Sequence, residues 1–490
     1  MTSKKKMGGR VIAFFMSIVF VVLLFPMQSY ATDFEMPCNR HVVVDGHDMG
    51  AIMTFDYYYD HDVYVPLKSI AATLVGTSKA YAVECYNGEI HVRTGVNHQG
   101  SAYVWPEEEI ANPFRVDVAR HKLFINDEER KYYSVKKGMP DGSLDYFYSL
   151  IDVAMMLNLS MDIREDVIYI DTTKDFAVTP EQIVASGYLQ GVNGLVIGDA
   201  TTGDIYLSYD AEKAFAIAST TKLMTYLLVQ EAISEGEIGA NDFVTITPEA
   251  EKISKGVDGT IPMMAGWQVP LEELLLGLLL PSSNECGYML SVYVAGSEEA
   301  FAKRMNEKAK ELGLDSAYFY NAHGLPLYTE QLIPGKVQNH MSAADMFTLT
   351  GYILREYPQI REITSRREAN LPTLGQYVKN TNPLLYNIPE AKGLKTGTTN
   401  KAGACLVTLL EAEYEGQKHD LVVVLLGAET NIDRETVSEI AARCALLMLR
   451  GGASVSDVIE AEPEGIPQDP EKVMQRLVRK GLQNSAADHG

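Results

Sequence analysis

The chain has 490 residues, of which 46% are hydrophobic and 22% are charged. These values are typical of a globular protein and exclude a largely disordered one, and the length allows two or more domains with sizeable cores. The formal net charge of −23 argues against nucleic acid or an anionic surface as the main partner.

Residues 1–31 have the features of an export signal. Basic residues precede the apolar run VIAFFMSIVFVVLLF, and Ser29 and Ala31 give the small-x-small pattern that precedes a cleavage point. The apolar run is short for a membrane span, so we expect a signal peptide, with an uncleaved anchor as the alternative. We therefore expect the protein to be exported, to the extracellular space, the cell wall or the outer face of the cytoplasmic membrane.

Residues 32–175 contain an internal repeat. The helix-like segment at 64–74 aligns with the one at 147–157, and a short strand follows each of them, at 88–94 and 166–172. Alternating β-type sequence precedes each helix, which predicts a small α+β domain of two strand–helix–strand units. The layout resembles the N-terminal module of copper amine oxidases, a resemblance that brings no copper with it.

The histidines and cysteines do not form a recognisable metal or redox motif. The cysteines lack paired C-x-x-C spacing, so we expect no metal and no cofactor. Cys38 and Cys85 share a domain and could pair outside the cell, whereas Cys286, Cys405 and Cys444 favour buried free thiols. Surface positions are expected for the histidines of residues 32–175, namely His41, His47, His61, His91, His98 and His121.

Residues 176–454 are predicted to form a second domain. Two strands occupy 193–210, a helix starts at Ser219 and a long helix-rich stretch follows. The chain then returns to β-type sequence, including 419–429, and closes on a helix at 434–452. This order predicts an α/β (α+β) domain: an antiparallel sheet flanked by helices, with the first and last helices on one face, plus a helical subdomain.

Ser-x-x-Lys occurs three times, as Ser3–Lys6, Ser134–Lys137 and Ser219–Lys222. The first pair lies in the predicted signal peptide and would be removed with it by cleavage. The second lies in a polar, glycine-containing connector that we interpret as a solvated loop. The third runs into an apolar stretch and has two interpretations. Either Ser219 is a helix N-cap and Lys222 a solvated first-turn residue, or the two are a nucleophile and its base.

Two further motifs favour the second interpretation. Ser282-Ser283-Asn284 is the only Ser-x-Asn triplet in the chain, and Lys395-Thr396-Gly397-Thr398 lies on a predicted strand. Ser-x-x-Lys, Ser-x-Asn and Lys-Thr-Gly in this order are the signature of penicillin-binding proteins and class A β-lactamases. Residues 180–452 closely resemble the serine-type D-alanyl-D-alanine carboxypeptidases of peptidase family S11, the low-molecular-weight penicillin-binding proteins.

The residue types suit an acyl-transfer site. Side chains at i and i+3 share a helix face, so Lys222 is expected beside the hydroxyl of Ser219. Lys222 can accept the serine proton only when neutral, and burial together with the nearby cation Lys395 would lower its pKa. We therefore assign Ser219 as nucleophile and Lys222 as base, with Ser282 as relay.

Substrate-binding roles are expected for the remaining motif residues. The Asn284 carboxamide can accept from Lys222 and donate to the substrate backbone, while Lys395 and Thr396 suit a terminal carboxylate. Gly397 leaves room for a substrate lying along the strand edge. The resemblance implies an oxyanion hole formed by the backbone N–H groups of Ser219 and Thr398.

The resemblance implies removal of the terminal D-alanine from peptidoglycan stem pentapeptides through a Ser219 acyl-enzyme, with β-lactams as inhibitors. A β-lactamase is an alternative, but no convincing Glu-x-x-x-Asn follows the second motif. A catalytically weak wall-binding protein is another, although it would be expected to have lost Ser219, Lys222 or Lys395. A transpeptidase differs only in its acceptor, which no motif reveals.

Four features stand apart from the three motifs. Glu285 replaces the aspartate that usually follows the asparagine in the family. Cys286 is expected to pack as a small apolar residue, and His323 is interpreted as structural, outside the immediate catalytic contacts. Residues 455–490 form a C-terminal tail whose segment DPEKVMQRLVRKGL is either a basic amphipathic helix that rests on a membrane surface or a frayed end.

Overall fold

The computed structural model describes residues 36–57, 62–110, 114, 116–139, 142–256, 258–328, 336–452 and 459–461. The predicted signal at 1–31 and the predicted amphipathic helix of the tail lie outside these residues. The chain divides into two compact units: an N-terminal unit of residues 1–128 and 132–175, and a C-terminal unit of residues 129–131 and 176–490.

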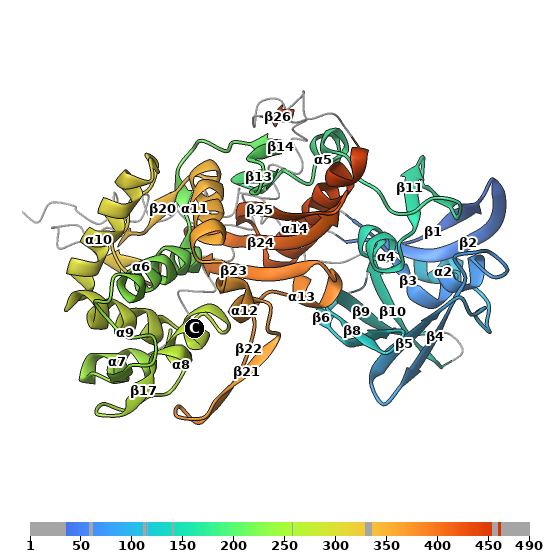
Figure 1. Ribbon diagram of the computed structural model, residues 1–490. Coiled ribbons are helices and arrows are strands. Elements are labelled where there is room, and N and C mark those ends of the chain that lie inside the picture. The colour runs from blue at the N-terminus through green and yellow to red at the C-terminus, as the bar shows by residue number, and fades with distance from the viewer. Residues whose placement is uncertain are drawn as a thin grey trace, which may run out of the picture. The chain divides into compact units, whose positions relative to one another are not determined.

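The N-terminal unit holds an eight-stranded sheet in the order β11-β12-β1-β2-β3-β10-β9-β6 and a four-stranded sheet in the order β4-β5-β7-β8 (Figure 1). Its helices are α2 (Leu67–Thr73), α3 (Glu107–Ile110) and α4 (Leu150–Leu157). Its strands are β1 (Met36–Val44), β2 (His47–Asp56), β3 (Val63–Pro66), β4 (Tyr81–Tyr86), β5 (Glu89–Thr94), β6 (Val118–Arg120), β7 (Lys122–Ile125), β8 (Glu128–Arg130), β9 (Tyr133–Gly138), β10 (Leu144–Ser149), β11 (Ser160–Arg164) and β12 (Val167–Asp171).

The two predicted strand–helix–strand units are confirmed. Helices α2 and α4 each follow a short strand, and those strands, β3 and β10, pair antiparallel with Val65 opposite Tyr148. A strand missing from the prediction follows each helix, β4 after α2 and β11 after α4. The second strand after each helix is the predicted one, and it pairs parallel with the strand that opens the other unit, β5 with β7 and β12 with β1. Ile70 of α2 and Val153 of α4 lie in one buried core, which explains the repeated apolar positions.

Three expectations for this unit need correction. Ser134 and Lys137 lie on strand β9 rather than in a loop, and Ser134 is buried. Because strand side chains alternate between faces, residues three apart point to opposite sides and cannot act as a pair. Cys38 and Cys85 are free thiols. Of the histidines predicted at the surface, His41 and His47 are exposed, His61 lies outside the described residues, and three others are half-buried, namely His91, His98 and His121.

The C-terminal unit is built on a six-stranded sheet in the order β23-β24-β25-β13-β14-β26, antiparallel except for the β14–β26 pair. Its strands are β13 (Gly194–Asp199), β14 (Asp204–Tyr209), β23 (Ala391–Thr399), β24 (Gly403–Tyr414), β25 (Gln417–Ala428) and β26 (Ile459–Ala461). Short two-stranded sheets pair β15 (Phe215–Ala216) with β20 (His340–Met341), β16 (Phe243–Thr245) with β17 (Gln268–Pro270), β18 (Leu327–Tyr328) with β19 (Lys336–Val337), and β21 (Glu368–Leu371) with β22 (Gln376–Lys379).

Helices cover both faces of this sheet (Figure 1). Strand β25 is buried at every position from 421 to 428, and a strand buried on consecutive residues has both faces covered. Helices α14 (Asn431–Leu447) and α11 (Ala343–Glu356) both contact β25 and β13. Val422, Val424 and Leu426 of β25 pack in one core with residues of α11. The residues between them point to the opposite face of the sheet, which α14 covers.

The remaining helices include a helical subdomain of α6, α8, α9 and α10, which contact one another. The helices and helical turns of the unit besides α11 and α14 are α5 (Pro180–Ala185), η1 (Ala218–Thr221), α6 (Lys222–Ser234), α7 (Pro248–Ser254), α8 (Leu271–Leu279), α9 (Asn284–Ala295), α10 (Glu298–Glu311), α12 (Ile360–Thr364), α13 (Leu384–Asn387) and η2 (Met448–Gly452). A sheet flanked by helices with a separate helical part confirms the predicted α+β architecture. The expectation that the first and last helices share one face is wrong, because α6 packs in the core that holds α11, whereas α14 lies on the other face.

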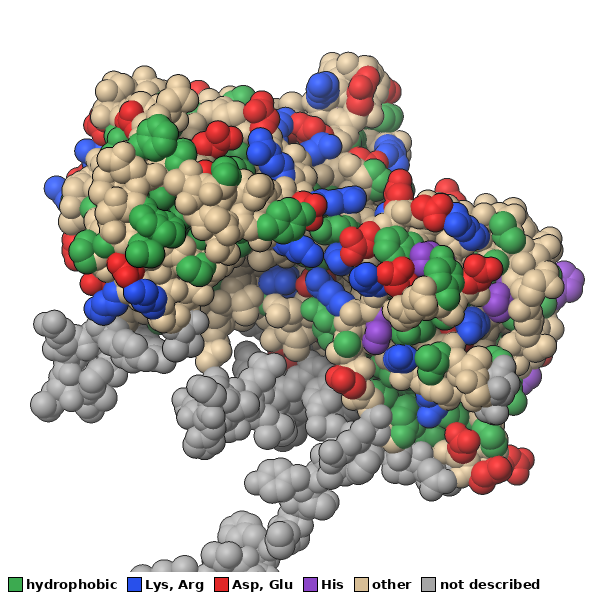
Figure 2. Space-filling model, turned by 90° about the horizontal axis from the view of Figure 1, so that it is seen from below, with side chains coloured by type: hydrophobic (Ala, Val, Ile, Leu, Met, Phe, Trp, Pro, Cys, Tyr) green, Lys and Arg blue, Asp and Glu red, His purple; other side chains and the backbone are tan. Residues whose placement is uncertain are grey.

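The surface mixes charges of both signs. Figure 2 shows lysine and arginine side chains interspersed with aspartate and glutamate on the face in view, although the whole chain carries a net charge of −23. The acidic excess is therefore not displayed there as a patch of one sign.

Candidate active site

Ser219 lies in a tight turn that precedes a buried helix. The predicted α-helix does not start at Ser219: residues Ala218–Thr221 form a 3₁₀ turn, η1, and α6 begins at Lys222. The turn is anchored because the Ile217 N–H donates to the Asn339 carbonyl over 3.1 Å. Ser219 is half-buried, whereas Lys222 is 0% exposed, so the interpretation of Lys222 as a solvated first-turn residue is wrong.

The Lys222 amine has three hydrogen-bond partners. Its Nζ lies 2.8 Å from Ser219 Oγ, 2.9 Å from Asn284 Oδ1 and 3.0 Å from the His323 carbonyl oxygen. The amide and carbonyl oxygens can only accept, so each requires an N–H from the amine. A neutral amine has two N–H groups and one lone pair. When both N–H groups are taken, the lone pair is directed at the hydroxyl of Ser219.

Burial lowers the pKa of Lys222 to about 7, against the opposing influence of the Glu285 and Cys286 charges. We expected Lys395 to contribute to this lowering. Instead, repulsion between the two amines acts on Lys395, whose pKa is lowered well below its usual range by burial, then by Lys222 and Arg434.

The Ser-x-Asn motif lies where α8 gives way to α9. Asn284 is the first residue of α9, and its Nδ2 donates to the Asp258 carbonyl over 3.0 Å. Ser283 caps the helix by accepting from the Cys286 N–H. Ser282 adopts a positive φ of 69°, and within the described residues its hydroxyl is not a partner of Lys222.

The carboxylate of Glu285 supports the loop beside the motif. Glu285 is 0% exposed, and its Oε1 accepts from the backbone N–H groups of Thr260, at 3.0 Å, and Ile261. The longer side chain at this departure from the family pattern therefore still holds a backbone segment. That segment includes Asp258, the partner of Asn284.

The Lys-Thr-Gly motif lies on β23, the edge strand of the six-stranded sheet, as predicted. A Cβ placed on Gly397 would lie 2.8 Å from Ser219 N and 3.0 Å from Thr220 N, so the strand packs directly against the nucleophile turn. Lys395 Nζ donates to the Thr396 carbonyl over 2.8 Å. The Thr396 hydroxyl lies 2.5 Å from that of Thr381.

Two groups were missed by the sequence analysis. Arg434, in the first turn of α14, is buried and donates to the Thr398 hydroxyl over 3.2 Å, and its charge contributes to lowering the pKa of Lys395. The interpretation that placed His323 outside the catalytic contacts is also wrong, because its backbone carbonyl binds Lys222. Among the described residues, no group of three or more His, Cys, Asp or Glu could hold a metal ion.

Comparison with known proteins places this site in a family. The family model described as D-alanyl-D-alanine carboxypeptidase, peptidase S11, matches residues 184–430, which contain all three motifs. The chain belongs to this carboxypeptidase family. The matched region begins before β13 and ends at Thr430, the residue that caps α14.

Named relatives agree with the family match. D-alanyl-D-alanine carboxypeptidase DacF of Bacillus subtilis is 31% identical over 242 residues, which are 49% of this chain and 58% of that protein. DacD of Escherichia coli, another D-alanyl-D-alanine carboxypeptidase, is 31% identical over 53% of this chain and 62% of its own. The chain thus spans about three fifths of the length of these carboxypeptidases.

Solved structures of penicillin-binding proteins are also similar to this family member. Penicillin binding protein 6B from Escherichia coli is 27% identical with a TM-score of 0.45, over 52% of this chain and 77% of that chain. The peptidoglycan synthesis regulatory factor PBP3 from Streptococcus pneumoniae is 28% identical with a TM-score of 0.47, over 53% and 70%.

The close contact between Gly397 and Ser219 in this carboxypeptidase-family site can be tested by mutation. Gly397→Ala is expected to lower the rate of covalent labelling by a fluorescent penicillin by between about tenfold and a hundredfold, because the new Cβ displaces either β23 or the Ser219 N–H. Gly351→Ala, on α11, is the matched control, since its Cβ would meet only Ala200 at 3.7 Å. A Gly397→Ala rate equal to that of the control would show that the contact is not required.

Proposed function

We propose that the C-terminal unit is a serine D-alanyl-D-alanine carboxypeptidase that removes the terminal D-alanine from peptidoglycan stem pentapeptides. The observation that carries the proposal is the buried Lys222 amine, 2.8 Å from Ser219 Oγ and with its other two directions fixed by acceptors. A serine hydroxyl becomes a useful nucleophile only when a neighbouring base takes its proton.

Acylation would begin with transfer of the Ser219 hydroxyl proton to the lone pair of Lys222. Ser219 Oγ then attacks the carbonyl carbon of the penultimate D-alanine and forms a tetrahedral intermediate. The C–N bond breaks, the terminal D-alanine leaves with a proton on its amine, and an ester to Ser219 remains. Water cleaves the ester, which returns the proton to Ser219 and releases the shortened peptide.

Recognition of the substrate's terminal carboxylate is assigned to Lys395 and Thr396, with Arg434 added from the structure. A carboxylate beside Lys395 favours its protonated form and offsets the repulsion from Lys222 and Arg434. Asn284 has a second amide N–H besides the one given to Asp258, and we assign it to the substrate backbone.

The backbone N–H groups of Ser219 and Thr398 are proposed as the oxyanion hole, since Gly397 holds β23 against the Ser219 turn. Each such donor stabilises the transition state by about 3–4 kcal/mol. Ser282 stays a proposed proton relay toward the leaving amine, a role that would require its hydroxyl to reach the leaving nitrogen from a half-buried position.

The proposed partners are peptidoglycan stem peptides, with β-lactams as slow-leaving inhibitors that acylate the same serine. Within the described residues no helix has both the length and the apolar character needed to cross a membrane. We propose that the enzyme is exported to the extracellular space, the cell wall or the outer face of the cytoplasmic membrane and acts in peptidoglycan biosynthesis and cell shape. Peripheral contact with the membrane surface is proposed for residues 455–490. The N-terminal unit is proposed to be copper-amine-oxidase-N-like.

The purified full chain is expected to release one free D-alanine from each pentapeptide that ends in D-Ala-D-Ala, without cross-linked product. Mass spectrometry of the peptide and an assay for D-alanine measure this directly. A matched pentapeptide ending in L-Ala-L-Ala is the control and should remain intact. Rapid penicillin turnover with no D-alanine release would favour a β-lactamase instead.

A further inference from the structure

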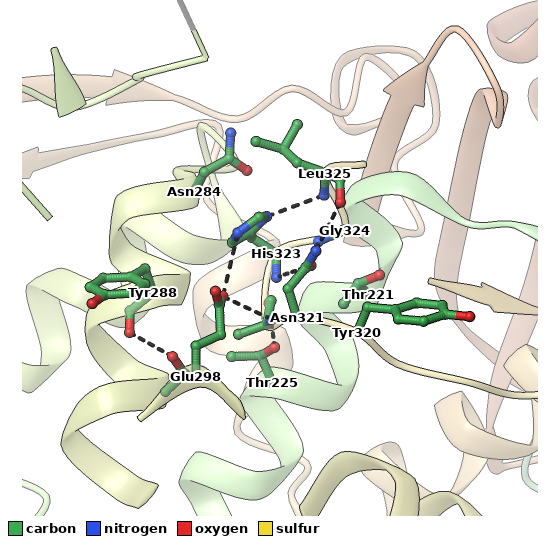
Figure 3. A network of polar contacts seen from close by, with 12 residues as sticks. Thr221, Thr225, Asn284, Tyr288, Glu298, Tyr320, Asn321, His323, Gly324 and Leu325 are labelled. Carbon is green, nitrogen blue, oxygen red and sulfur yellow. Dashed lines mark hydrogen bonds and ion pairs between the residues drawn. The ribbon is translucent and has the colours of Figure 1, made fainter. Parts of the chain in front are cut away.

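The backbone carbonyl that binds Lys222 is held by a polar network behind the site (Figure 3). Residues 321–325 form a tight turn in which Asn321 Oδ1 accepts from the Gly324 N–H over 2.7 Å and Asn321 Nδ2 donates to the Leu325 carbonyl over 2.8 Å. Both bonds join residues within the turn, so they stabilise its shape but not its position. From outside the turn, the Thr225 hydroxyl of α6 donates to the Ala322 carbonyl over 2.6 Å, and Asn339 Nδ2 donates to the Asn321 carbonyl over 2.8 Å.

Glu298, the first residue of α10, adds a contact on the side of the His323 ring. Its Oε1 accepts from the Ala322 N–H over 3.3 Å and lies 3.4 Å from His323 Nε2. Figure 3 shows the carboxylate reaching from its helix toward the imidazole ring. One oxygen thus contacts both the backbone and the ring of the segment whose carbonyl binds Lys222.

The tautomer of His323 follows from its other nitrogen. Nδ1 accepts from the Leu325 N–H over 3.2 Å, so the neutral ring carries its proton on Nε2, facing Glu298. The ring is 9% exposed, and burial together with the Lys222 charge lowers the pKa of His323 to about 3. It is therefore a neutral, fixed spacer between Glu298 and the turn.

We propose that Glu298 is a positioning residue that, through Ala322 and the His323 ring, holds the His323 carbonyl against the Lys222 amine. The inference rests on the proposed function, because it takes Lys222 as the base. Without this anchor the bonds from Thr225 and Asn339 still hold the turn, but the His323 ring side is released. The carbonyl then fixes one N–H of the amine less tightly, and the lone pair is less well directed toward Ser219.

Other charged and titratable groups around Glu298 are few among the described residues. Glu299 is the next residue of the same helix and is exposed. Tyr288 faces Glu298 from α9, and His323 faces Glu298 from the turn. Burial raises the pKa of Glu298 to about 7, with a smaller contribution from Glu299. The turn must therefore be tested across a range of pH rather than at one value.

The experiment measures the second-order rate constant for labelling by a fluorescent penicillin between pH 5 and 10 in the full chain. Glu298→Ala is expected to lower the plateau by between about tenfold and a hundredfold. It is also expected to move the rising limb to lower pH, because a carbonyl stabilises the ammonium form of Lys222 more than the amine. Glu298→Gln keeps an accepting oxygen and should match wild type, as should the control Glu299→Gln.

His323→Ala supplies an independent test if Glu298→Ala fails to fold. It is expected to show the same lowered plateau and shifted limb, and the double variant should add nothing, since both substitutions break one path. An unchanged rate profile in the alanine variants, a lower plateau with an unmoved limb, or an equal loss in Glu298→Gln would overturn the inference. Failure of the proposed function itself is distinguishable, because wild type would then release no D-alanine from the pentapeptide, whatever its labelling by penicillin.

Discussion

Ser219→Ala is expected to abolish covalent labelling by penicillin and to lower D-alanine release by more than about 10³-fold. The substitution removes the atom proposed to form the covalent bond to the substrate, while Lys222 and the strand against the turn remain. The loss should appear in the rate of acylation rather than in folding, because Ser219 is half-buried and, within the described ranges, its hydroxyl is hydrogen-bonded to Lys222 alone. Gel fluorescence and intact-protein mass measure the adduct.

Ser234→Ala is the matched control, since this exposed serine ends α6, the helix that follows the Ser219 turn. Its hydroxyl donates to the Glu231 carbonyl over 2.9 Å and lies 3.5 Å from the Tyr357 hydroxyl, away from the site. It should label at the wild-type rate. A penicillin adduct that persists in Ser219→Ala, located to another residue by peptide mapping, would show that the nucleophile has been assigned to the wrong side chain.

Lys222→Arg is expected to lower the acylation rate by about 10²- to 10⁴-fold, even though it keeps a cation at the site. A guanidinium is not deprotonated in proteins, so it cannot take the proton of Ser219. The variant therefore separates the role of base from the role of charge. Lys213→Arg, an exposed lysine ahead of the same turn, is the control.

The wild-type pH profile checks the same assignment. Because the pKa of Lys222 is lowered from 10.5 to about 7, the amine is protonated below that pH and neutral above it. The acylation rate should therefore rise as pH increases through about 7 and then reach a plateau. Near-wild-type labelling of Lys222→Arg, or a rate that falls through this range, would contradict a neutral lysine base.

The side chains of the site could be predicted from the sequence because their chemistry is carried by residue identity and spacing. Ser219 and Lys222 meet across one turn, and Asn284 accepts from Lys222 as expected. The Lys-Thr-Gly segment lies on an edge strand. Each of these follows from a local pattern, and their order along the chain adds the long-range information that one motif lacks.

What the sequence analysis missed has a physical reason in each case. The His323 carbonyl carries no side-chain signal, since every residue offers the same backbone acceptor. Arg434 could have been found, because a buried cation in the first turn of a helix opposes the helix dipole and such local conflicts often mark functional sites. Ser134–Lys137 was misread because Gly138 ends strand β9 instead of placing the pair in a loop.

In the N-terminal unit, the parallel strand pairs β1–β12 and β5–β7 each join one repeat to the other, which affects the order in which this unit can fold. The parallel partner of β1 is β12, so His41–Val44 align with residues 167–170, the last strand of the unit. A chain that emerges from its N-terminus onward keeps one edge of its first strand open until more than a hundred further residues have followed. Closure of that edge is a late, non-local event, and truncation before Val167 should leave it exposed to strand pairing with other molecules.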